Sequence, residues 1–149
     1  MPRLKLEDLF ATLGDTLLIE LIDIDGILHV LTAADRKLHL HTVGRTPDRA
    51  VDLARFLLRR LAYGGGGAGE RESMVDDVGR RLEASLLGPA AAELGDRSVV
   101  VVPPGRLHAV PWALLPSLRS RVVSVAPSAA AWLRAARTRP PRRRNVAGR

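Results

Sequence analysis

Three histidines lie in one short stretch of the chain and could in principle share a metal ion. His29 and the pair His39 and His41 fall in segments whose apolar pattern predicts neighbouring strands of a small sheet. The predicted turns pair His29 with Leu40, so His29 faces away from His39 and His41, and Asp23 would lie about 9.5 Å from His41. So few ligands converge that the pattern favours a solvated sheet face over a zinc site. No metal and no other cofactor is predicted.

His108 is the remaining histidine, and it lies between an apolar run and Trp112. A base at this position could activate the hydroxyl of Ser124 or Ser128. Ser128, however, directly precedes a helical Ala-rich segment, where an N-cap role accounts for it. The chain has no Gly-x-Ser-x-Gly motif, and no acidic residue is near in sequence to orient the imidazole. These residues therefore do not favour serine hydrolysis.

A glycine-rich stretch at 64–70 formally contains the spacing Gly-x-Gly-x-x-Gly. A dinucleotide site needs this motif directly after a strand, whereas here it follows an amphipathic helical pattern. A P-loop is also excluded, because no Lys-Ser or Lys-Thr pair ends the stretch. We interpret residues 64–70 as a flexible linker.

Length and composition restrict the class of protein. The chain has 149 residues, which fits one domain, and 46% hydrophobic residues with few aromatics. It contains no cysteine, which excludes disulfides and thiolate metal sites and suits a reducing cytosol. No apolar run reaches the ~18 residues of a membrane span, and no signal peptide is indicated. We predict a cytoplasmic protein without membrane contact.

The net charge of +7 is concentrated at the C-terminal end of the sequence. Residues 137–149 hold six arginines and no acidic residue, so the preceding chain is nearly neutral. A nucleic-acid contact through Arg142, Arg143 and Arg144 is one hypothesis for this tail. It lacks the interleaved aromatics that stack on bases, so we favour the flank of a further strand.

The N-terminal part of the chain predicts a helix and a small antiparallel sheet. Apolar spacing indicates a helix over 4–13, and residues 16–43 read as a three-strand meander with strands at 16–23, 26–32 and 37–43. Asp25-Gly26 supplies the first tight turn and residues 33–36 the second. One face of this sheet should carry Ile22, Leu31, Leu38 and Leu40, with Glu20 and His29 among them, and the other should carry His39 and His41.

Two amphipathic helices follow, at 47–63 and 71–87. Thr46 suits the N-cap of the first helix and Pro47 its first helical position, while Gly88-Pro89 breaks the second. We expect the two helices to lie antiparallel and to cover a sheet formed by the next strands.

The most distinctive stretch begins with four consecutive valines, Val99 to Val102. Such a run without polar alternation predicts a strand buried on both faces, as in a parallel sheet. Core strands are therefore expected at 98–102 and 121–125, with a helix starting at Pro111 between them. The predicted fold class is α/β: the meander and the two helices come first, then the first strands of a mainly parallel sheet.

This stretch resembles the opening of the CHAT domain, a caspase-like module often found behind tetratricopeptide repeats in bacterial proteins. The resemblance rests on VVVPPGRLHAVPWALLP followed by SVAPSAAAWL, and upstream on LEASLLGPAAAELGDRS. The residues that match the motif, all expected to be structural, are Pro103, Gly105, Leu107, Pro111, Trp112, Pro127 and Ser128. The resemblance implies that residues 1–136 are the N-terminal part of a CHAT-like domain.

The family resemblance implies a cysteine peptidase whose His and Cys lie at the ends of two later strands. The sequence has no cysteine and reaches Arg149 before either strand would occur. We therefore expect a truncated CHAT-like protein that is not an enzyme by itself, with a scaffold or protein-interaction role. The alternative is a small interaction module that binds a protein partner at its exposed sheet edge.

Overall fold

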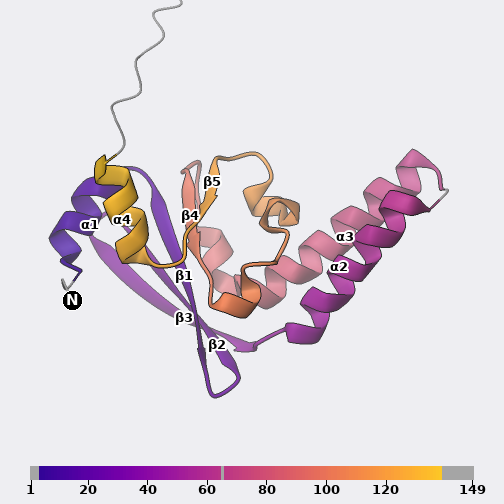
Figure 1. The fold of residues 1–149 in the computed structure, drawn as a ribbon, viewed down its shortest axis with the longest axis horizontal. Helices are drawn as coiled ribbons and strands as arrows, with labels where there is room; N and C mark the ends of the chain where they lie inside the picture. The colour runs from indigo at the N-terminus through magenta and orange to yellow at the C-terminus, as the bar shows by residue number, and fades with distance from the viewer. Residues whose placement is uncertain (1–3, 65, 139–149) are drawn as a thin grey trace, which may run out of the picture.

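The computed structural model describes residues 4–64 and 66–138. These residues form a mixed α/β fold around one five-stranded sheet with the strand order β3-β2-β1-β4-β5 (Figure 1). The predicted α/β class is confirmed. The sequence placed the meander beside the parallel layer, whereas the structure joins both into one sheet.

The antiparallel meander consists of β1 (Leu17–Ile24), β2 (Ile27–Ala34) and β3 (Lys37–Arg45). Asp25 and Gly26 have φ of 51° and 81°, as a tight two-residue hairpin turn requires. The second turn is also of two residues, Asp35 and Arg36, with φ of 53° and 60°. The predicted turn at 33–36 was placed too early, so the predicted register between β2 and β3 was wrong.

The correct register pairs His29 with Thr42, and Leu40 with Leu31. The slip is two residues, so no side chain changes face. The predicted face assignment is confirmed, since Glu20 pairs with Leu31, Ile22 with His29, and His39 and His41 alternate with that set.

The valine run forms β4 (Val99–Val102), and all four valines are buried, as predicted. β4 lies between β1 and β5 (Val123–Val125) and is parallel to both. Val100, for example, pairs with Leu18 on one side and with Ser124 on the other. The strand has ladder partners along both of its edges. It needs no polar face because both faces are covered: Val99 and Val101 lie in one core, and Val100 and Val102 lie in the other.

One face of the sheet is covered by the helical hairpin and by short 3₁₀ segments. The hairpin is α2 (Asp48–Tyr63) and α3 (Ala68–Leu86), followed by η1 (Gly88–Glu93). Between β4 and β5 the chain forms η2 (Gly105–Leu107), η3 (Trp112–Leu114) and η4 (Pro116–Leu118). The larger core lies beneath these elements and includes Ile19, Val30, Leu86, Val101 and Leu115.

The opposite face is covered only in part, by α1 (Leu6–Leu13) and α4 (Ala129–Thr138), which lie side by side (Figure 1). Leu9, Leu13, Val100, Val102 and Ala129 belong to this second, smaller core. The meander end of the face remains open, where Leu38 and Leu40 are 43% and 64% exposed.

Several predicted helix boundaries were wrong. Thr46 does not cap α2: Pro47 occupies the N-cap position without a side-chain hydrogen bond, and Thr46 Oγ1 donates to Asp23 Oδ2 instead, at 2.6 Å. α3 begins at Ala68, so it takes up part of the predicted linker. The helix expected from Pro111 is replaced by short 3₁₀ turns, because Pro116 interrupts the run with a residue that has no N–H.

The hairpin covers less of the sheet than predicted. Val51 and Ala54 of α2 and Leu82 and Leu86 of α3 are buried near its base. Beyond that point the two helices extend away from the sheet, towards the right of Figure 1. None of the helices in the described ranges has the length and apolar composition to cross a bilayer.

Candidate functional site

The residues of the predicted motif have packing and capping roles. Leu107 and Trp112 are buried in the larger core, whereas Gly105 and Pro127 are exposed. The Ser128 hydroxyl accepts a hydrogen bond from the Ala131 N–H at 3.0 Å, which is the geometry of an N-cap. The motif therefore builds the connection from β4 through β5 to α4.

His108 is exposed in the turn that follows η2. Within the described part of the chain, no hydrogen bond joins it to Ser124 or Ser128. The serine-hydrolase hypothesis gains no support from this arrangement. Arg142, Arg143 and Arg144 lie outside the described residues, so the nucleic-acid hypothesis stays a prediction.

The structure does bring His39 and His41 together with a residue that sequence reasoning missed, Glu93 of η1. Nδ1 of His39 lies 2.5 Å from Glu93 Oε1, and Nε2 of His41 lies 3.2 Å from the same oxygen. The His41 nitrogen is buried, and its contact does not have hydrogen-bond geometry. The meander alone holds too few ligands to predict this cluster, because the third ligand lies 52 residues beyond His41.

Thr32, which pairs with His39 on the neighbouring strand, holds the Glu93 carboxylate in place. Its side chain is almost completely buried, and Oγ1 donates to Glu93 Oε2. Burial by itself would raise the pKa of Glu93, but the hydrogen bonds with Thr32 and His39, together with the nearby charge of His41, outweigh it, so the pKa lies below its usual value. The carboxylate is therefore ionised and oriented at the point where the two imidazoles meet.

A second polar cluster forms around Asp23 at the end of β1. Its carboxylate accepts hydrogen bonds from the Thr46 hydroxyl, at 2.6 Å, and from the Gly26 N–H, at 2.9 Å, and it pairs with Arg106. Arg106 also contacts Asp48 at 3.2 Å. The cluster ties the first strand to the start of α2 and to the η2 turn, and each of these side chains has a partner.

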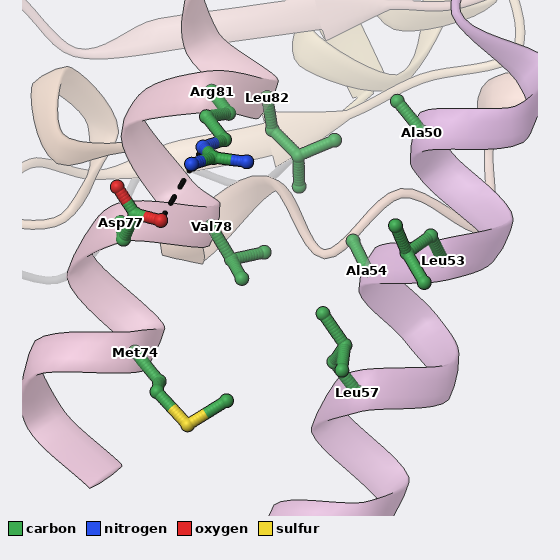
Figure 2. A pocket seen from close by; sticks show the side chains of 9 residues that line it. All are labelled: Ala50, Leu53, Ala54, Leu57, Met74, Asp77, Val78, Arg81 and Leu82. Carbon is green, nitrogen blue, oxygen red and sulfur yellow. Dashed lines mark ion pairs between the residues drawn. The ribbon is translucent and has the colours of Figure 1, made fainter. Parts of the chain in front are cut away.

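The projecting hairpin carries an apolar groove between its helices (Figure 2). The groove has a volume of about 250 Å³, and Leu53 and Leu57 of α2 face Met74 and Val78 of α3 across it. A further hollow of about 300 Å³ continues past Leu57 and Met74 towards the tip. Leu53 and Met74 are 57% and 44% exposed, so the seam between the helices is only partly closed.

The sheet edge formed by β5 is the third candidate surface. β5 pairs with β4 on one side only, and it lies at the end of the strand order. Val122 and Val125 beside it are 69% and 44% exposed. Both observations agree with the predicted exposed edge, although the strand is only three residues long.

Comparison with known proteins does not assign the chain to a family. No protein-family model matches the chain, and no curated protein matches it with significance. The likeness to the CHAT domain therefore rests on the motif residues alone.

Proposed function

We propose that this protein is a CHAT-like chain without peptidase activity of its own that serves as a scaffold for protein association. The proposal draws on the motif between β4 and α4 and on the lack of any cysteine in the 149-residue sequence. A thiolate is required for the nucleophilic step that the family resemblance implies. What this chain offers instead is exposed apolar surface.

The groove of the α2–α3 hairpin carries this proposal. Leucine and methionine side chains that would be buried in a finished bundle are exposed along both helices, as Leu53 and Met74 are. Methionine and large aliphatic residues in a groove between helices are typical of surfaces that accept another amphipathic helix. Closing the seam with a third or fourth helix would bury this apolar area, and apolar burial is worth about 25 cal/mol per Å².

The charges beside the groove favour a second copy of the hairpin as the occupant. α2 carries four arginines and two aspartates, whereas α3 carries five acidic residues and three arginines. Two hairpins related by a twofold axis place the basic α2 of one copy against the acidic α3 of the other. The result is a four-helix bundle whose charges are complementary at both symmetric contacts.

Light scattering after size-exclusion chromatography tests the proposal. The wild-type chain should have twice the monomer mass, and Leu53→Glu and Met74→Glu should each give monomers, because they place a carboxylate in the seam. Leu40→Glu is the matched control: this leucine is 64% exposed on β3, away from the hairpin, and its variant should stay dimeric. A wild-type monomer at high micromolar concentration, or dimers that persist in both groove variants, would refute association through this groove.

A further inference from the structure

The geometry points to a divalent metal site of the zinc type formed by His39, His41 and Glu93, and we propose that these three side chains bind such an ion. The three ligand atoms lie within 4.8 Å of one another. Two imidazoles with one carboxylate form a donor set that zinc uses in proteins, usually with a fourth position open to water. This site is independent of the hairpin groove.

The ligands come from two elements that the fold holds rigidly together. His39 and His41 are two residues apart on β3, so the strand pleat places both imidazoles on the same face. Glu93 ends η1, which packs against β3. Ligand atoms of a tetrahedral zinc centre lie about 3.4 Å apart, which follows from bonds of about 2.1 Å. Glu93 Oε1 lies 3.2 Å from His41 Nε2 and 2.5 Å from His39 Nδ1, so the His39 and Glu93 side chains must rotate apart to admit the ion.

The surroundings have features expected of a metal site rather than of a simple surface ion pair. Nε2 of His41 is buried and lacks a hydrogen-bond partner, whereas a metal ion would satisfy its lone pair. The buried Thr32 hydroxyl bonds the far oxygen of Glu93, as outer partners of ligating carboxylates do. The site therefore has three ligands and one outer partner, the Thr32 hydroxyl.

The remaining coordination position lies towards solvent. His39 has a side chain that is 55% exposed, and with Glu93 it borders a hollow of about 280 Å³. Lys37, Asp35 and Arg97 also line this hollow, and Arg97 pairs with Asp35 there. A water molecule is therefore the fourth ligand that this environment favours.

Calorimetric titration of the full, untagged chain with Zn²⁺ tests the site, with Co²⁺ absorption as a second readout. One ion should bind per chain, and Co²⁺ should give the visible band of a tetrahedral complex. His39→Gln and Glu93→Gln should weaken Zn²⁺ affinity at least about 100-fold, and Thr32→Val about 10- to 100-fold. His29→Gln is the control, because His29 lies on the opposite sheet face beside Thr42, and it should bind Zn²⁺ as the wild type does.

Circular dichroism of each variant shows whether it is folded, and His39→Gln is the safest substitution because this side chain is the most exposed of the three ligands. The proposal is overturned if the folded wild type binds no Zn²⁺. It is also overturned if His39→Gln and Glu93→Gln bind as tightly as the wild type. Neither result would affect association through the hairpin.

Discussion

Gly79 in α3 and the carbonyl oxygen of Leu114 in η3 approach each other so closely that a side chain at position 79 has no room. A Cβ atom there would lie 2.3 Å from that oxygen. Arg119 reinforces the contact, because its guanidinium donates to the same carbonyl at 3.1 Å and pairs with Asp76 of α3. The position of the hairpin over the segment between β4 and β5 therefore depends on a glycine.

The variant Gly79→Ala should destabilise the protein although alanine is the better helix former. Displacing backbone atoms costs about 1–3 kcal/mol, against a gain of about 1 kcal/mol in helix propensity. Gly69→Ala on the same helix is the matched control, since a Cβ there meets nothing within 4 Å. It should be neutral or stabilising. Urea denaturation measures both, and a Gly79→Ala variant more stable than wild type would contradict the packing described here.

Replacing Ser128 should loosen α4. The hydroxyl caps the Ala131 N–H, and losing an N-cap costs about 1 kcal/mol. Ser128→Ala should therefore lower the unfolding free energy by this amount, whereas Ser128→Asp keeps an oxygen acceptor at the cap and should retain most of the stability. Equal stability of wild type and Ser128→Ala would show that the cap contributes nothing.

The Asp23 cluster makes stability depend on pH in a defined direction. The Thr46 hydroxyl, and after it the Gly26 N–H and the charge of Arg106, lower the pKa of Asp23 in the folded state. A lowered folded-state pKa gives stability that is present above the unfolded value of about 3.9 and is lost as the pH falls through the folded value. Asp23→Asn should thus be less stable than wild type at neutral pH, and the difference should narrow below about pH 4.

Denaturation midpoints measured from neutral to acidic pH test this prediction. Glu20 responds in the opposite sense, because burial raises its pKa. Comparing wild type with Asp23→Asn at each pH removes that contribution, since Glu20 is present in both proteins. If the stability difference between wild type and Asp23→Asn stays constant as the pH falls below about 4, the pKa of Asp23 is not lowered in the folded protein.

Sequence patterns correctly predicted those turns and strands that depend on neighbouring residues. The Asp25-Gly26 turn fixed the first hairpin, and the unbroken valine run indicated a strand buried on both faces. Sequence alternation also placed His39 and His41 on one face correctly. The register of the second hairpin was missed because Asp35 and Arg36, neither of them glycine, adopt positive φ in its turn.

Features that depend on tertiary contacts were not predictable in the same way. Glu93 reaches the histidines only because η1 folds back onto β3, and no spacing in the sequence encodes that contact. Thr46 has the residue type of an N-cap, yet a tertiary partner, Asp23, takes its hydroxyl. The parallel pairing of β1 with β4 joins strands separated by both hairpin helices, so the single sheet could not be read from neighbouring residues.

The β5 edge predicts different responses to proline at adjacent positions. Val99 donates to the Val122 carbonyl and Ala126 donates to the Val101 carbonyl, both at 2.9 Å. Backbone groups alternate in direction along a parallel strand, so Ser124 also bonds towards β4, whereas Val125 directs its N–H outward. Ser124→Pro should remove a ladder bond and destabilise the fold, and Val125→Pro should be tolerated, as proline is at the free side of an edge strand.

Because the backbone N–H groups of β5 alternate in direction, folding and strand addition depend on different residues of this strand. A segment that adds to β5 must accept the outward N–H of Val125, so Val125→Pro should block such pairing while leaving the inner ladder intact. Thermal unfolding of the two proline variants checks the orientation, with Ser124→Pro expected to melt well below Val125→Pro. If Val125→Pro is the less stable of the two, the outward direction of its N–H is wrong and β5 does not present the free edge described here.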